Sequence, residues 1–343
     1  MAEVNSSIKE AKFLQEMKGQ AKSPIYFGSI CLFLCFIPIA VKNEYYLHVL
    51  ISLFYHIIYA STYRFILRTG QFHLGAHAFI GIGAYSCALL VTRLGFSFWL
   101  ALPIAGLISA ICAVIVGYPT LRLKGIYFAI ITWGLGDTMK FLYIRFENLF
   151  GGALGIFSIP EPDPIPFFSS IDFSQKSHYY VLSVLLMMFT LYVLHRMEKS
   201  RLGLIFGAIR EGDQLARSLG VNIMNYKVLA FSICSGLAAM AGGFYAHYTY
   251  YISPKDFSVL LTIYLAIYTV VGGKDNYYGC IIGTTVLMLA GEIFAGYAHY
   301  QLLMYSGLLV FIILFLPNGL VSLYDIARRL FSSAHKSTAL KDA

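Results

Sequence analysis

Residues 200–222 read SRLGLIFGAIREGDQLARSLGVN and lie between two strongly apolar segments, as a loop between membrane spans would. Within this loop, Leu, Ile and Ala residues recur in a rough helical stripe with charged residues interleaved, which predicts an amphipathic helix over about 204–220. Gly220 supplies a helix stop, because glycine adopts the left-handed conformation at no steric cost. Such a helix must either lie in the lipid interface or dock into a partner protein.

The composition is that of an integral membrane protein. Of 343 residues, 58% are hydrophobic and only 12% are charged, whereas soluble domains carry about 25% charged residues. The first apolar run, residues 25–41, is followed by Lys42 rather than by a small-residue cleavage site, so we expect it to be retained as a span. The six cysteines fall in or beside apolar stretches without CxxC or Cys/His spacing, which predicts inert buried thiols and no metal site.

Apolar segments of suitable length predict an all-α, polytopic transmembrane helical bundle of about ten spans. They cover about 25–41, 45–67, 74–92, 97–118, 127–146, 179–196, 228–250, 258–272, 279–296 and 301–316. The count becomes nine if the short segment 258–272 is re-entrant.

The basic residues orient these spans. With ten spans, 19 of the 25 Lys and Arg residues fall on the side that holds both termini, which makes that side cytoplasmic. Residues 1–24 are then a cytoplasmic segment, 25–320 the membrane domain with an outer loop at about 147–178, and 321–343 a cytoplasmic tail. The net charge of +8 reflects this orientation and predicts no nucleic-acid partner.

Small residues gather in two stretches, GQFHLGAHAFIGIGAY at 70–85 and AAMAGGFYA at 238–246. Such faces let membrane helices approach closely, and glycines at the start of a span also permit a broken helix that lines a polar pathway. His73 and His77 are four residues apart and would share a helical face, in a packing or pathway role. The candidates for a pathway or for helix packing are Gly70, Gln71, Gly75, Gly81, Gly83, Thr132, Asp137, Gly242 and Gly243.

Asp137 lies about half-way through its predicted span. A carboxylate at that depth is costly and normally faces the bundle interior or a water-filled path. It has either a pathway or helix-partner role, or it makes a structural hydrogen bond or is a protonated acid, and both interpretations stay open. Glu292, near the outer end of its span, is a weaker case that snorkelling would explain.

Enzyme signatures are absent from the sequence. There is no GxSxG, no HExxH and no GxxxxGK[ST], so we predict no catalytic residues and no nucleotide site in this chain. If transport is driven by ATP, the ATP and its Mg²⁺ are bound on another polypeptide.

Five stretches in one order resemble the LivM-type permeases of branched-chain amino acid ABC transporters. They are GQFHLGAHAFIGIGAY (70–85), LRLKGIYFAIITWGLGD (121–137), AIREGDQLARSLGVNIMNYKVLAF (208–231), the run from AGGFYAHY to VVGGKDNYYGCIIG (241–283), and FLPNGL (315–320). The outer segment GGALGI (151–156) is also similar to a family motif.

The resemblance implies a permease subunit that moves substrate by alternating access from a periplasmic binding protein into the cytoplasm. Its implied partners are a homologous LivH-like permease, two LivG- and LivF-like ATP-binding subunits and the lipid of a bacterial inner membrane. It also implies that the AIRE segment is a coupling helix in a groove of an ATPase. The contact candidates are Ala208, Ile209, Arg210, Glu211, Leu215, Ala216, Leu219 and Gly220.

Three other functions stay open at this point. Urea and short-chain amide permeases share most of these motifs. A stand-alone secondary transporter is the rival of another class, although Asp137 is the only deeply placed charge that could couple a cation. A membrane scaffold is supported by the small-residue faces alone.

Overall fold

Helices make up almost all the regular structure in the part of this chain that the structure describes. The computed structural model describes residues 43–123, 125–164, 175–218, 220–297, 300–316 and 319–321, together with 34, 35, 38 and 173. Within these residues the elements are α2 (Glu44–Arg68), α3 (Ala76–Thr92), α4 (Phe98–Thr120), α5 (Ile126–Arg145), α6 (Glu147–Phe150), the 3-10 turn η1 (Gly152–Leu154), α7 (Lys176–Lys199), α8 (Arg201–Glu211), α9 (Asp213–Ser218), α10 (Ile223–Thr249), α11 (Val259–Gly272), α12 (Gly279–Ala295) and α13 (Gln301–Phe315). The expected all-α class is confirmed.

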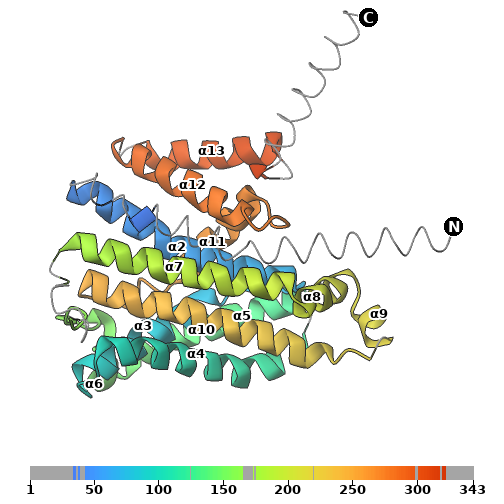
Figure 1. Cartoon of the computed structure of the whole chain (residues 1–343), viewed down its shortest axis with the longest axis horizontal. Coiled ribbons are helices and arrows are strands. Elements are labelled where there is room, and N and C mark those ends of the chain that lie inside the picture. Colours follow the sequence, from blue (N-terminus) through green and yellow to red (C-terminus); the bar gives the residue numbers. More distant parts are fainter. Residues whose placement is uncertain are drawn as a thin grey trace, which may run out of the picture.

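Two long helices form the centre of the bundle. Of the most apolar 18-residue stretch of each helix, 83% of the residues are buried in α2 and 78% in α10, compared with 39% in α4. Helix α10 packs on α2, α3 and α4, while α2 also packs on α7, α11 and α12. These helices lie side by side along the long axis, with α12 and α13 on one flank and α8 and α9 at one end (Figure 1). We call that end the α8 end.

The length and polarity of the helices support a membrane location. Helices α2, α4, α7 and α10 are long and apolar enough to cross a bilayer. The helix α11 has 14 residues and is therefore about 21 Å long, less than the roughly 30 Å of a hydrocarbon core. The expected spans from 45–67 onward each contain a helix. The expected first span, 25–41, and the expected tail, 321–343, lie almost entirely outside the described residues.

The contact between α3 and α10 depends on glycine. A Cβ on Gly83 would lie 2.2 Å from the Ala239 carbonyl oxygen, and one on Gly242 would lie 2.3 Å from that of Ile80. Only residues without side chains allow two backbones to come this close. The helix contact therefore has the form that the small-residue stretches predict.

The segment predicted as one helix over 204–220 is two helices. Helix α8 ends at Glu211, Gly212 is extended with φ −178° and ψ 112°, and α9 begins at Asp213. The prediction of a continuous helix was wrong because glycine costs about 1 kcal/mol inside a helix and because Asp213 instead forms an ion pair with Lys227. Gly220 has a left-handed φ of +78° just after α9, as its predicted role as a helix stop requires.

Candidate functional site

The corner between α7 and α8 is set by Ser200 and Gly203. The Ser200 hydroxyl oxygen accepts a hydrogen bond from the Leu202 backbone N–H at 3.2 Å and so caps α8. A Cβ on Gly203 would lie 2.0 Å from the Glu198 carbonyl oxygen, so glycine is needed for α8 to fold back this closely. Helix α8 therefore leaves the bundle in a defined direction.

Helices α8 and α9 have a buried side and an exposed side. Ile209, Ala216 and Ile223 are buried against one another, which fastens both helices to the start of α10. The exposed side carries Arg210, Glu211 and Leu204, and the Leu204 side chain is 78% exposed.

This arrangement places the predicted contact residues in different positions. Arg210, Glu211 and Gly220 are exposed, and Ala208 is half-buried. Ile209 and Ala216 face inward, so they hold the two helices to the bundle. The backbone of Leu215 lies in α9, and Leu219 is outside the described residues.

Two ion pairs tie α8 to the α11–α12 connection and α9 to the first turns of α10. Arg210 Nη1 lies 2.5 Å from Asp275 Oδ1, in the connection between α11 and α12. Lys227 Nζ lies 3.2 Å from Asp213 Oδ1, and both of these side chains are largely buried. Gly70 also lies here, since a Cβ on it would be 3.6 Å from the Arg210 Cα. Two connections that are distant in sequence, α2–α3 and α11–α12, thus meet at α8, and the start of α10 lies against α9.

A buried charge network lies beneath this meeting point. Arg64 of α2, whose side chain is 1% exposed, forms an ion pair with Glu198 at the end of α7. Arg68 Nη1 lies 3.0 Å from the other Glu198 carboxylate oxygen. The Arg64 guanidinium also lies 5.3 Å from the centre of the Tyr277 ring, within the range of a cation–π contact. The network joins α2, α7 and the α11–α12 connection.

Tyr277 closes this network on its other side. Its hydroxyl donates a hydrogen bond to the Leu191 carbonyl oxygen of α7 at 2.6 Å. Burial raises the pKa of the Tyr277 hydroxyl, so the group stays protonated and remains a donor at neutral pH. The same short connection therefore binds α7 through Tyr277 and α8 through Asp275.

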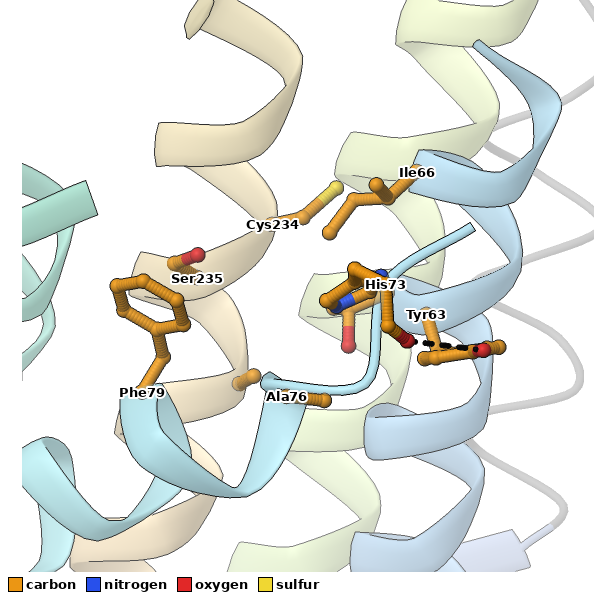
Figure 2. Close-up of a pocket in the computed structure, with 9 residues that line it drawn as sticks. Tyr63, Ile66, His73, Ala76, Phe79, Cys234 and Ser235 are labelled. Carbon is orange, nitrogen blue, oxygen red and sulfur yellow. Dashed lines mark hydrogen bonds between the residues drawn. The ribbon is translucent and has the colours of Figure 1, made fainter. Parts of the chain in front are cut away.

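The segment before α3 is not helical. Figure 2 shows it as a loop that carries His73 between α2 and α10. The His73 ring stacks on Tyr63 with centroids 4.8 Å apart, and the Tyr63 hydroxyl donates to the His73 carbonyl oxygen at 3.2 Å. A cavity of about 10 Å³ beside them has room for one water molecule at most.

His73 and His77 do not share a helical face, contrary to the prediction. Helix α3 begins only at Ala76, after Gly75. The loop is held open by α5, because the Leu74 N–H donates to Thr132 Oγ1 at 3.0 Å instead of continuing a helix. A Cβ on Gly75 would lie 2.4 Å from the Thr132 carbonyl oxygen. The structure thus brings together Gly75 and Thr132, both predicted from the sequence.

Polar side chains from α3, α5 and α11 meet inside the bundle. His77 Nδ1 lies 2.9 Å from Thr262 Oγ1, which also accepts a hydrogen bond from the His77 backbone N–H at 3.0 Å. A Cβ on Gly136 would lie 2.0 Å from His77 Nε2, so glycine makes room for the imidazole against α5. The half-buried Asp137 is the next residue of α5. Hydrogen-bonding groups and a carboxylate at this place suit the lining of a polar path.

The other predicted residues lie at helix contacts. Gly81 faces Phe257 and Tyr143, and Gly243 faces Cys87 and Leu102. The Gln71 side chain is 3% exposed, and its Oε1 has no hydrogen-bond partner among the described residues. Within the described part of the chain, no three His, Cys, Asp or Glu side chains gather in a way that could hold a metal ion.

Sequence reasoning missed the Arg64–Glu198 pair and the His77–Thr262 contact. The ion pair of Arg64 could have been predicted, since an arginine within an apolar segment needs a counter-charge. Glu198 is the only acidic residue of α7, so it was the available partner. Thr262 carried no signal, because a threonine in an apolar helix commonly bonds to its own backbone.

Comparison with known proteins gives one family and several relatives. Residues 45–317 match the family described as "Branched-chain amino acid transport system / permease component". The chain is 31% identical over 272 residues to the high-affinity branched-chain amino acid transport system permease protein LivM of Salmonella typhimurium, covering 74% of this chain and 64% of that relative. It is 30% identical over 287 residues to LivM of Escherichia coli K12, covering 78% and 68%.

A more distant relative comes from an archaeon. The chain is 24% identical over 238 residues to the probable branched-chain amino acid transport permease protein LivM of Methanocaldococcus jannaschii, covering 65% and 67%. The chain spans less than two thirds of the Salmonella relative's length. No solved structure matches.

Proposed function

Since the chain belongs to the family of branched-chain amino acid transport permeases, we propose that it is the transmembrane subunit of an ATP-driven importer for leucine, isoleucine and valine. The chain is a multi-pass membrane protein of a transport permease family. Its proposed location is a bacterial inner membrane, with about ten spans and both termini in the cytoplasm. The distribution of 19 of 25 basic residues on one side supports this orientation.

The proposed complex has further subunits. A homologous second permease completes the pathway, two ATP-binding subunits hold ATP and Mg²⁺, and a periplasmic binding protein delivers substrate. The sequence offers no P-loop of its own, which is why the nucleotide sites are assigned to partners.

The observation that carries the proposal is the position of α8 and α9. They lie at one end of the bundle (Figure 1). Their exposed side chains include Leu204, Arg210 and Glu211. A helix that lies on lipid carries a wide apolar face and many lysines, whereas residues 200–222 contain no lysine. Mixed charges beside an exposed leucine suit a protein groove instead.

Motion of α8 has a physical route into the bundle. The α8 end joins Arg210 to the α11–α12 connection, and Tyr277 of that connection joins it to α7 and Arg64. ATP binding and hydrolysis in the partner subunits would move α8 and α9. Through the contacts of Arg210 and Tyr277, this movement would rearrange the helices around Asp137, so that the transport path opens first to the outside and then to the cytoplasm. Asp137 is proposed as a pathway residue, supported by the hydrogen-bonding groups beside it.

The coupling role is tested by exchanging the charges of Arg210 and Glu211. We expect Arg210→Glu with Glu211→Arg to insert normally and to reduce ATP-driven leucine uptake in proteoliposomes about tenfold or more, because like charges then face each other at the ATPase groove. The matched control is Arg210→Glu with Asp275→Arg, which restores the internal ion pair with reversed signs.

The two variants separate docking from internal packing. If α8 couples to the ATPase, Arg210→Glu with Asp275→Arg should still show reduced leucine uptake, because the charge that it presents to the partner at position 210 is still reversed. Normal uptake and normal substrate-stimulated ATPase in the first variant would exclude the coupling role. The substrate is tested by calorimetry on the cognate binding protein with leucine, urea and acetamide, and binding of urea or acetamide alone would exclude amino acids.

A further inference from the structure

A large cavity lies at the end of the bundle opposite α8, between α11, α12 and α13. Its volume is about 450 Å³, within the roughly 300–1,000 Å³ of small-molecule sites. Its position follows from the course of α12, which begins at the connection that contacts α8 and carries Glu292 in its last turn. Figure 1 shows α12 and α13 together on one flank, and α11 packs against α12 and α13. Its lining includes Tyr264, Tyr268, Leu287, Glu292, Gln301 and Tyr305.

Aromatic rings form one wall of the cavity. Tyr264 and Tyr268 stack with centroids 6.3 Å apart and an interplanar angle of 24°. Tyr305 of α13 meets Tyr264 edge-on with centroids 6.4 Å apart. These rings and the half-buried Met288 give the cavity an apolar wall, while Leu287 behind them is fully buried.

Glu292 supplies the one charge of this lining. Its Oε1 accepts a hydrogen bond from the Tyr45 hydroxyl at 2.5 Å. Among the described residues no Lys, Arg or His forms an ion pair with it, so its negative charge is not neutralised within that part of the chain. Glu292 thus lines a cavity. Snorkelling toward the membrane surface, the explanation considered from the sequence, does not account for this position.

We propose that this cavity binds a primary ammonium that carries a short aliphatic chain. The ammonium pairs with the Glu292 carboxylate, and the aliphatic chain packs on Met288, Tyr264 and Tyr305. A ligand with a net negative charge is disfavoured because the Glu292 carboxylate would repel it. An amino acid is a zwitterion without net charge and can place its ammonium at Glu292 with its own carboxylate turned away. Resting on the proposed function, the ligand is the transported amino acid, held at the outer end of its path.

A neighbouring glycine offers a probe position inside the cavity. Gly291 lines it, and a Cβ there would meet only the Tyr305 ring at 3.8 Å, which is ordinary contact. Gly307 of α13 is exposed, and a Cβ on it would have nothing within 4 Å. Gly291→Cys and Gly307→Cys therefore place a thiol inside and outside the cavity without disturbing the backbone.

The test measures the rate at which N-ethylmaleimide modifies these variants. The full chain is assembled with its partner subunits in nanodiscs of phosphatidylglycerol, a lipid without an ammonium group, and the parent chain gives the background of its own six cysteines. We expect L-leucine and leucinol, at ten times their Kd or more, to slow labelling of Gly291→Cys about tenfold, because the occupied site blocks the thiol and only about a tenth of the sites stay free. The keto acid 4-methyl-2-oxopentanoate, which lacks the ammonium, should not protect.

Two further variants identify the group responsible. Adding Glu292→Gln to Gly291→Cys should abolish protection, whereas Tyr45→Phe should retain it, because the carboxylate keeps its charge. Labelling of Gly307→Cys should not respond to any ligand. Protection by the keto acid, protection that survives Glu292→Gln, or no protection by leucine would each overturn the site.

The same ammonium chemistry is found in phosphatidylethanolamine. If that lipid slows labelling in the absence of leucine and leucine adds nothing, the assignment to an amino acid is wrong. Leucine uptake by the parent complex is measured separately. Uptake without protection rejects this site and keeps the proposed function, whereas protection without uptake keeps the site and rejects the function.

Discussion

Removing the charge of Glu198 should destabilise the α8 end of the bundle more than any change at a surface ion pair. Glu198 is 7% exposed and faces Arg64, which is 1% exposed, as well as the partly exposed Arg68. In Glu198→Gln the Arg64 guanidinium stays buried without its counter-charge. Two of its nitrogens, Nε and Nη1, already lack hydrogen-bond partners among the described residues.

The expected cost follows from this burial. Breaking a buried ion pair by removing one partner costs about 3–5 kcal/mol. With an unfolding entropy of about 2.1 cal/mol/K per residue over 343 residues, this corresponds to a fall in Tm of roughly 4–7 °C. The matched control is Glu44→Gln, since the Glu44–Lys176 pair is exposed, with side-chain exposures of 76% and 42%. An exposed pair of this kind contributes about 0–1 kcal/mol.

The assay is thermal unfolding of the purified chain in one detergent, followed by intrinsic fluorescence and by aggregation. A double variant, Arg64→Met with Glu198→Leu, removes both charges together and should recover most of the lost Tm, because apolar side chains of similar size replace a buried pair at little cost. Equal Tm values for Glu198→Gln and Glu44→Gln would refute the assignment of a buried, stabilising pair. A double variant less stable than Glu198→Gln would refute the reasoning about the uncompensated charge.

Two further changes test the helix contact and the polar cluster. Gly83→Leu should severely reduce the yield of folded chain, because its Cβ would lie 2.2 Å from the Ala239 carbonyl oxygen and overpacking costs about 1–3 kcal/mol or more. The yield is measured by size-exclusion chromatography. The control is Gly134→Leu, whose Cβ meets nothing within 4 Å. A normal profile for Gly83→Leu would contradict the backbone contact. Asp137→Asn should lower leucine uptake more than it lowers assembly with the partner subunits, and unchanged uptake kinetics would remove Asp137 from the pathway.

The sequence was sufficient for the helices and insufficient for their contacts. Helices α2, α4, α7 and α10 are long uninterrupted apolar runs, so their existence followed from length and polarity alone. The break between α8 and α9 was harder to predict, since the apolar stripe continues across Gly212. The break places Asp213 beside Lys227 of α10, a contact that only the folded chain reveals.

In the candidate site too, residue types could be predicted from the sequence but their contacts could not. Gly75, Gly83 and Gly242 were recognisable as close-contact residues by type, but their partners on α5, α10 and α3 were not. Glu198 and Arg64 are 134 residues apart in sequence, and no local pattern joins them. Composition and periodicity report what each segment prefers, whereas these pairs depend on which helices become neighbours.

The central claim is that this chain moves amino acids only as part of an ATP-driven complex. The direct measurement is uptake of labelled leucine into proteoliposomes that contain either the chain alone or the chain with a second permease, two ATPases and the binding protein. We predict uptake in the complete set that requires ATP hydrolysis, and none with the chain alone. Leucine uptake by the chain alone, driven by an ion gradient or without any energy source, would contradict the account.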